Sequence, residues 1–275
     1  MDIAGAESAP PHNGGAPGIA LAAILYVDAF LTGAIVMSFE MLGSRYLNPY
    51  FGSGIYTWAA LISTVLAALT AGYFLGGRIA DRTASAALLG TLVSLASLYL
   101  EALPSFAQNI LEFVFGADDN MRTGSLLAAL AIMFVPVMML GVYSPFAIRL
   151  LLRSARQSGA VSGAVYGIST AGSIAGTLGT TFFLIPLLGT RAITLLLGAA
   201  GIACGLALIA VARGSRGRGA VAGLVVGMLA LLATRSGATE PFDEAVRAAM
   251  LKQHDGQVAR VETEYNDLFV TKTGS

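Results

Sequence analysis

The sequence has little charge, little histidine and almost no cysteine. Charged side chains make up 12% of its 275 residues, about half the share of roughly 25% found in soluble domains. Acidic and basic residues are equal in number, at 16 each, so there is no net basic charge to attract nucleic acid. Cys204 has no second cysteine for an intrachain disulfide, and His12 and His254 lie in opposite terminal segments without further ligands at metal-binding spacing. We therefore expect neither nucleic acid nor a metal ion as a partner.

Long apolar runs occupy most of the chain. A helix of about 20 apolar residues spans the ~30 Å hydrocarbon core of a bilayer, and short charged segments separate such runs here. The sequence predicts an all-α fold, a polytopic transmembrane helical bundle of six or seven spans, with the lipid bilayer as partner. The seventh run would be only about 24 Å long as a helix. The predicted spans are Gly18–Leu42, Ile55–Gly76, Ser85–Leu103, Gly124–Leu152, Val161–Leu188, Ala192–Ala212 and Gly219–Thr234.

Composition divides the chain into three regions. Residues 1–17 are rich in Pro, Gly and Ala and lack Lys and Arg, so we expect a disordered tail and not a signal peptide. Residues 18–235 form the predicted transmembrane helical domain. Residues 236–275 regain charged side chains and contain two runs at strand spacing, "QVARVETEY" and "DLFVTKT". We expect this last region to be a soluble segment with a short β-hairpin.

Three local patterns bear on how the helices pack. Pro136 and Pro145 interrupt the fourth run and predict a kink or a discontinuous helix. Residues 105–120 are too charged and too short to cross, so we expect an interfacial helix there. Glycines spaced by four predict close helix contacts, with a ligand groove as the alternative. These glycines are the pairs Gly72 and Gly76, Gly163 and Gly167, Gly172 and Gly176, Gly201 and Gly205, and the series Gly219, Gly223 and Gly227.

The arginines predict the orientation in the membrane. Alternate loops on one side carry Arg78, Arg82, Arg149, Arg153, Arg156, Arg213, Arg216 and Arg218, whereas the other side carries Arg45, Arg122 and Arg191. The positive-inside rule makes the richer side cytoplasmic. We therefore expect a multi-pass protein of a bacterial-type inner (plasma) membrane with a cytoplasmic N-terminus. Six spans would place the C-terminal segment inside, and seven would place it outside.

Acidic residues occur within the predicted spans. Asp28 lies in the middle of the first span, and Glu40 lies near its end. Because an ionisable group at membrane depth is costly, it marks a function or a partner, and we take both as candidate binding residues. The alternative for Asp28 is an interfacial position, and for Glu40 an interfacial ion pair with Arg45. Glu101 closes the third span, where we expect it to reach the headgroups.

The segment "GGRIADR", which ends at Asp81 and Arg82, follows the second span. It predicts a tight cytoplasmic loop in which Asp81 caps the next helix, and we assign Asp81 and Arg82 a structural or ion-pairing role. The segment resembles the first half of the G-x-x-x-D-R loop of major facilitator transporters. The second basic cluster of that loop is missing, since "TASAA" follows.

A longer combination of motifs resembles the spermidine synthase-like membrane proteins, in which a transporter-like membrane domain is fused to an aminopropyltransferase. Glu40, Arg45, "PYFGSGIYTW" and "GYFLGGRIADR" carry the resemblance, together with "PVMMLGVYSPFAIRL" and the stretch "VYGISTAGSIAGTLGTTFFLIPLLGTR" around Tyr166. It covers nearly the whole chain from about Tyr26. The resemblance implies a polyamine as ligand and Tyr166 as a further binding residue.

The C-terminal "ETEYNDLFVT" resembles the first β-hairpin of an aminopropyltransferase domain, where the family reads Glu-Ser-x-Tyr-Gln-Asp-Ile-x-Val. Glu262, Tyr265, Asp267 and Val270 match, whereas Thr263 and Asn266 replace Ser and Gln. The resemblance implies that Tyr265 contacts the substrate. The family's Gly-rich loop and general-base Asp do not occur in the sequence, so we expect no catalytic residue and no cofactor here. Decarboxylated S-adenosylmethionine would enter as co-substrate only with the missing part of that domain.

Three functions follow from these patterns. In the first, the chain is the membrane domain of a spermidine synthase-like protein, ending in a truncated enzyme domain, and it anchors the enzyme or handles its polyamine. In the second, it is a stand-alone transporter-like module for a small cationic solute, with a homodimer supplying a second half. In the third, it is a structural membrane anchor without a small-molecule site.

Overall fold

The computed structural model describes residues 18–117 and 120–213, together with the backbone of residues 257–262 and 267–272. Six helical segments in it are long and apolar enough to cross a membrane. The chain is therefore a multi-pass helical membrane protein. The predicted tail 1–17 and the seventh run, 219–234, lie outside the described residues. The helices are α1 (Ile19–Phe51), α2 (Ile55–Arg82), α3 (Ala86–Ala117), α4 (Met121–Gly141), α5 (Tyr143–Leu151), η1 (Ala155–Gln157), α6 (Ser158–Gly179), η2 (Thr180–Leu184), α7 (Ile185–Leu187) and α8 (Thr190–Arg213).

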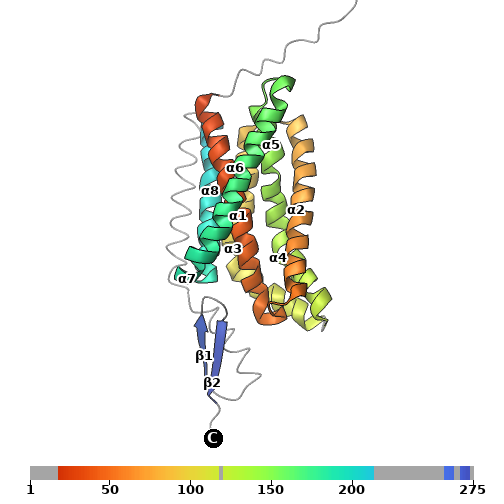
Figure 1. Cartoon of the computed structure of the whole chain (residues 1–275), viewed down its shortest axis with the longest axis vertical. Helices are drawn as coiled ribbons and strands as arrows, with labels where there is room; N and C mark the ends of the chain where they lie inside the picture. Colours follow the sequence, from red (N-terminus) through yellow and green to blue (C-terminus); the bar gives the residue numbers. More distant parts are fainter. Residues whose placement is uncertain (1–17, 118–119, 214–256, 263–266, 273–275) are drawn as a thin grey trace, which may run out of the picture.

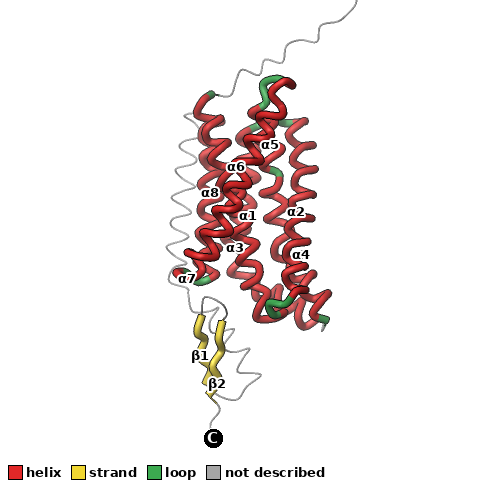
Figure 2. Tube along the Cα trace, in the orientation of Figure 1, coloured by secondary structure: helices red, strands yellow, loops and turns green. Residues whose placement is uncertain are grey.

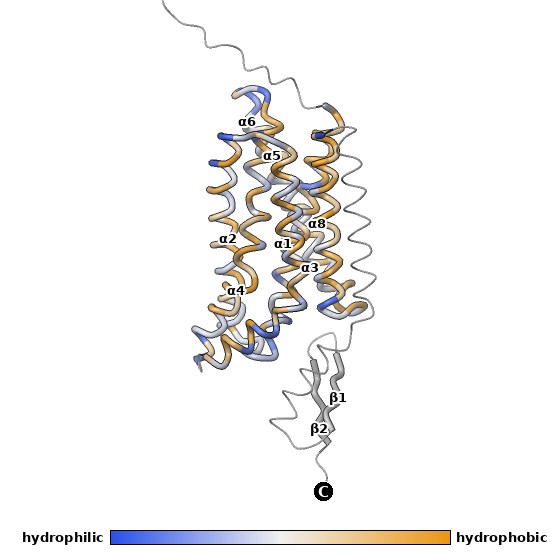
Figure 3. The backbone as a smooth tube through the Cα atoms, turned by 180° about the vertical axis from the view of Figure 1, so that it is seen from behind, coloured by the Kyte–Doolittle hydropathy of each residue, from blue (hydrophilic) through white to orange (hydrophobic). Residues whose placement is uncertain are grey.

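Successive long helices run in opposite directions along the bundle (Figure 1). Loops lie at the two ends, apart from the break between α4 and α5 (Figure 2). Apolar residues predominate along the middle of the helices, and hydrophilic residues gather at the ends (Figure 3). This distribution is the one that a hydrocarbon slab between two aqueous phases requires.

The helices are longer than the apolar runs. α1 has 33 residues, about 50 Å of helix, so it extends past a hydrocarbon core of ~30 Å. The expected separate interfacial helix is wrong, because α3 continues unbroken through Pro104 to Ala117. Within its last turns, Gln108 Nε2 donates a hydrogen bond to Glu112 Oε1 at 2.7 Å. One proline removes a single backbone hydrogen bond, and membrane helices tolerate that loss.

The fourth predicted span is discontinuous, as its two prolines indicated. α4 ends at Gly141, and α5 begins at Tyr143, two residues before Pro145. A Cβ atom added to Gly76 on α2 would lie 2.7 Å from the Val142 carbonyl oxygen. The absence of a side chain at Gly76 therefore lets α2 approach the break closely.

Glycines also bring two other helix pairs together. Gly172 and Gly176 on α6 lie against the backbone of Phe30 and Ala34 on α1, and Gly201 and Gly205 on α8 lie against α3. The predicted packing role of these pairs is confirmed. By contrast, nothing in the described part of the chain lies within 4 Å of a Cβ built at Gly163 or Gly167, so the packing predicted for that pair is not seen among the described helices. Gly219, Gly223 and Gly227 lie outside the described residues.

α1 lies at the centre of the bundle and packs against α6, α8, α4 and α2. Its side chains Leu25, Phe39, Leu42 and Leu47 are fully buried. A helix with buried residues on several faces is enclosed by its neighbours. The polar residues Asp28, Thr32, Ser38 and Glu40 on α1 are therefore held inside protein, not in lipid.

Two strands are described outside the bundle, β1 (Gln257–Glu262) and β2 (Asp267–Lys272). They pair antiparallel, with Gln257 opposite Lys272 and Glu262 opposite Asp267. Tyr265 lies outside the described residues. The predicted soluble β-hairpin, and its interpretation as the first hairpin of an aminopropyltransferase domain, both stay predictions.

Candidate functional site

Asp28 is buried within the bundle, nine residues after the start of α1. Its side chain is 2% exposed, and its Oδ2 atom has no hydrogen-bond partner among the described residues. Thr32, one turn further along the same face, is 5% exposed, and its Oγ1 atom also lacks a partner in that part of the chain. Burying polar atoms without hydrogen bonds costs free energy. One face of α1 therefore holds two polar atoms whose hydrogen-bonding capacity is unused.

Side chains from two other helices approach Asp28. The thiol of Cys204 on α8 donates a hydrogen bond to the Asp28 carboxyl. Tyr143 on α5 lies near enough to interact with Asp28 electrostatically, and its hydroxyl donates a 2.6 Å hydrogen bond to the Leu25 carbonyl oxygen. Since Tyr143 is the first residue of α5, the break at Val142 directly precedes it. The site thus joins α1, α8 and the discontinuous helix.

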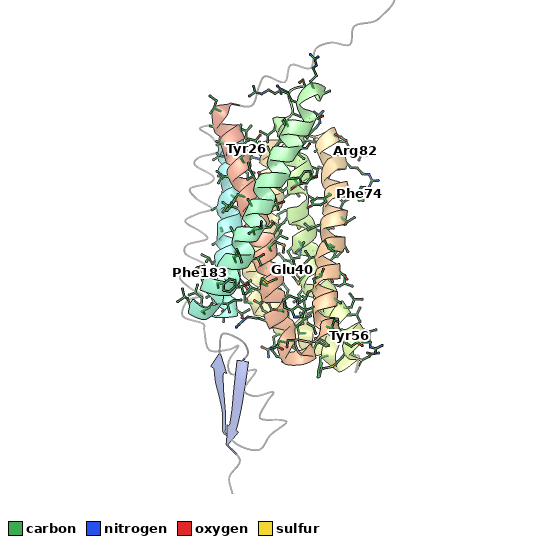
Figure 4. All side chains as sticks on the ribbon, viewed as in Figure 1. Tyr26, Glu40, Tyr56, Phe74, Arg82 and Phe183 are labelled. Carbon is green, nitrogen blue, oxygen red and sulfur yellow. The ribbon has the colours of Figure 1, made fainter. Side chains whose placement is uncertain are left out.

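Glu40 is also inside the bundle. Its side chain is 6% exposed, and Figure 4 shows it between the two ends, which are marked by Arg82 and Tyr56. This burial places the Glu40 side chain against neighbouring helices, and the interfacial position stays its alternative. Arg45, five residues further along α1, is half-buried. Their ion pair stays a prediction.

Glu101 does not reach the headgroups, and that expectation is wrong. Its side chain is 3% exposed, and a Cβ atom added to Gly198 on α8 would lie 2.9 Å from its Cγ. Because α3 continues 16 residues past Glu101 to Ala117, Glu101 sits mid-helix, not at a helix end. Gly198, whose missing side chain admits the carboxylate, lies on another helix, so no sequence signal reveals this burial.

The structure places the Tyr166 side chain at the surface of the bundle. Tyr166 on α6 is 44% exposed. Its ring meets Tyr73 of α2 edge-on, with the centroids 6.4 Å apart. Two half-exposed aromatic rings in contact on a membrane bundle are ordinary surface packing. The position of Tyr166 therefore gives no support to the binding role implied for it, which stays a prediction.

Asp81 and Arg82 lie at the arginine-rich end of α2. Asp81 pairs with Arg149 of α5, with 3.7 Å between Oδ1 and Nε, and both side chains are well exposed. The helix cap predicted for Asp81 is wrong, because the Ser85 hydroxyl accepts the hydrogen bond from the Leu88 N–H at the start of α3. Arg82 is exposed. This exposed pair links the ends of α2 and α5 outside the buried site.

Comparison with models of protein families, with curated proteins and with solved structures finds no match in any of the three. The chemistry of the buried site is therefore the basis for a function. In residues 18–117 and 120–213, no three Asp, Glu, His or Cys side chains come together in a way that could hold a metal ion. What the Asp28 site offers is one carboxyl, the two hydroxyls of Thr32 and Tyr143, and one thiol, all enclosed by apolar helices; such a set suits a cationic group.

Proposed function

We propose that this chain binds a small organic cation inside its transmembrane bundle and that Asp28 is the anionic partner. The observation that carries the proposal is the Oδ2 atom of Asp28, which is buried and has no hydrogen-bond partner within residues 18–117 and 120–213. An ionised Asp at the centre of a membrane helix costs roughly 2.5–3.5 kcal/mol on insertion scales. An ammonium group would offset this cost, because it supplies both the opposite charge and N–H donors.

The class of cation is argued from the hydrogen-bonding groups. An ammonium carries three N–H donors, and the unpartnered Asp28 Oδ2 and Thr32 Oγ1 are two acceptors on one face of α1. The resemblance of the membrane region to spermidine synthase-like proteins favours a polyamine. In that case the bundle anchors an aminopropyltransferase or handles its polyamine.

The stand-alone transporter is supported by a different feature, the break between α4 and α5. Discontinuous helices near the middle of a membrane commonly form the binding sites of transporters. Here the break directly precedes Tyr143, which lies next to Asp28. A carrier of small cations and a polyamine-handling membrane domain would use the same carboxyl.

The structural anchor is supported by the glycine contacts, which pack α2, α6 and α8 closely onto their neighbours. In this alternative, Asp28 stays protonated, and its role is confined to the hydrogen bond with Cys204. The anchor predicts that no cation binds in the bundle.

We also propose that the arginine-rich end faces the cytoplasm of a bacterial-type inner membrane. Arg78 and Arg82 at the end of α2, Arg149 and Arg153 around the end of α5, and Arg213 at the end of α8 lie at this end. The N-terminus of α1 lies at the same end (Figure 1). A reporter fused before Gly18, active only in the cytoplasm, tests this orientation.

Equilibrium binding of spermidine to the purified protein in lipid nanodiscs tests the function. The Asp28→Asn variant keeps the side-chain volume and removes the charge, and Asp81→Asn on the exposed surface is the matched control. We expect Asp28→Asn to weaken binding at least about tenfold, equivalent to ~1.4 kcal/mol, and Asp81→Asn to leave it unchanged. Equal affinity for Asp28→Asn and the parent protein would remove Asp28 from the site, and no binding by any variant would favour the anchor.

A further inference from the structure

A row of polar side chains on α3 faces α8. Ser94, Ser97 and Glu101 recur at intervals of three and four, which places them on one face of the helix. The two serine hydroxyls donate hydrogen bonds to backbone carbonyls one turn earlier, Ser94 to Gly90 and Ser97 to Val93, both at 2.8 Å. Ser97 is fully buried and Glu101 is 3% exposed. The row therefore lies inside protein, not against lipid.

Each side chain in this row lies against a glycine of α8. Ser94 meets Gly205, Ser97 meets Gly201 and Glu101 meets Gly198, and in each case an added Cβ would collide with the polar side chain. The glycines of α8 do more than shorten the distance between helices. They leave room for a continuous series of hydroxyl and carboxyl groups in an interface that is otherwise apolar.

The row leads to the Asp28 site along α8. Cys204, which bonds the Asp28 carboxyl, is adjacent to Gly205 and six residues from Gly198. Six residues correspond to about 9 Å along the helix, and the Ser97 hydroxyl at Gly201 lies halfway. Beyond Gly198, Thr194 forms a 3.0 Å hydrogen bond with the Tyr46 hydroxyl of α1. Polar groups thus follow α8 at about one per turn.

We propose that Glu101 is a proton-carrying carboxyl that couples proton movement to cation binding at Asp28. This rests on the proposed function. With no cation present, a proton neutralises Asp28, and an arriving ammonium displaces that proton because it needs the carboxylate. The proton passes by the Ser97 hydroxyl to Glu101, which has released its own proton toward the Thr194 end. For each ammonium group that pairs with the Asp28 carboxylate, one proton leaves that carboxyl, so the carboxyl itself is never left with an unbalanced charge.

Titratable and charged side chains can influence the protonation of Glu101 from each helix packed against α3. The helices α1, α4, α5 and α8 all contact α3. Carboxylate-to-carboxylate transfer through hydroxyl groups is a general way to move protons within a membrane protein. The titratable side chains on these helices are Tyr26, Asp28, Glu40, Arg45, Tyr46 and Tyr50 on α1, Arg122 on α4, Tyr143 and Arg149 on α5, and Arg191, Cys204 and Arg213 on α8, with Tyr99 and Glu112 on α3 itself.

Infrared difference spectroscopy of the protein in lipid tests Glu101 without any cation. A change from alkaline to acid buffer reveals the carbonyl stretch of each carboxyl that takes up a proton. We expect Glu101→Gln to lose a band of a buried carboxylic acid that the parent protein shows. Glu112→Gln, on an exposed turn of the same helix, should keep it, and Glu101→Asp should restore it. A spectrum of Glu101→Gln identical to that of the parent would overturn the proposal.

Coupling is tested in proteoliposomes that enclose a pH-sensitive dye. Addition of spermidine should move protons across the membrane at similar rates with the parent protein and with Glu112→Gln. With Glu101→Gln, provided that it still binds spermidine, the rate of proton movement should be at least tenfold lower. Equal proton movement in Glu101→Gln and the parent would overturn coupling through Glu101. A failure of the proposed function is distinct from this result, because it appears as absence of spermidine binding in every variant.

Discussion

The contact between α6 and α1 involves Gly172 and Gly176 of α6 and Gly33 of α1, and replacing Gly172 with alanine tests the packing. A methyl group at Gly172 would overlap the backbone carbonyl of Phe30. Backbone cannot rotate away as a side chain can, so the two helices must separate. Overpacking of this kind costs typically 1–3 kcal/mol.

Gly163 provides the matched control, since it lies on the same helix and nothing described lies within 4 Å of its Cβ position. Alanine there should gain roughly 0.8–1 kcal/mol of helix propensity. The same gain partly offsets the clash at Gly172. We therefore expect Gly172→Ala to be about 1–3 kcal/mol less stable than Gly163→Ala.

The difference is measurable by reversible unfolding of the protein in mixed micelles, with the helical signal followed as denaturing detergent increases. The spermidine titration on the same samples shows whether separation of α1 and α6 disturbs the Asp28 site. Equal stability of Gly172→Ala and Gly163→Ala would refute the close approach of α6 to the Phe30 backbone.

Three further substitutions have defined outcomes. Tyr143→Phe removes the hydrogen bond to the Leu25 carbonyl and should cost about 0.5–1.5 kcal/mol in the same unfolding assay; no loss would mean that this bond contributes nothing. Asn120→Ala removes the side-chain oxygen that caps the Arg122 N–H and should destabilise the protein by about 1 kcal/mol. A variant as stable as the parent protein would contradict this role of Asn120. Asp81→Asn breaks an exposed ion pair with Arg149 and should change stability by no more than about 1 kcal/mol, an effect that high salt should erase.

The membrane-spanning fold could be predicted from the sequence. The apolar runs are long enough to cross the hydrocarbon core, and in lipid a helix hydrogen-bonds its own backbone groups. The break at Val142 was predictable in the same way, since Pro145 has no N–H and cannot continue the hydrogen bonding of the preceding turn. The C-terminal end of α3 could not be predicted from the sequence. Pro104 and the charges after it indicated an end, yet the helix continues to Ala117, because local breakers are weaker than continuous packing against a neighbour.

The site was only partly predictable. Asp28 stood out because an ionisable residue within an apolar run is costly at membrane depth, with an interfacial position as the alternative. Glu101 was misplaced, since its burial depends on Gly198, 97 residues later on another helix, and sequence spacing carries no information on which helices meet. Tyr166 was chosen from a resemblance, and its position at the surface depends on the way α6 packs on α1.

Reaction with a hydrophobic carbodiimide tests the central claim most directly. The reagent partitions into the bilayer and adds to protonated carboxyls, which leaves a modification that peptide mass spectrometry assigns to a residue. We predict modification of Asp28 in the membrane-embedded protein and protection of Asp28 as spermidine concentration rises. Modification of Asp28 that is unaffected by spermidine, or no modification of Asp28 at all, would contradict a cation-binding carboxyl inside the bundle.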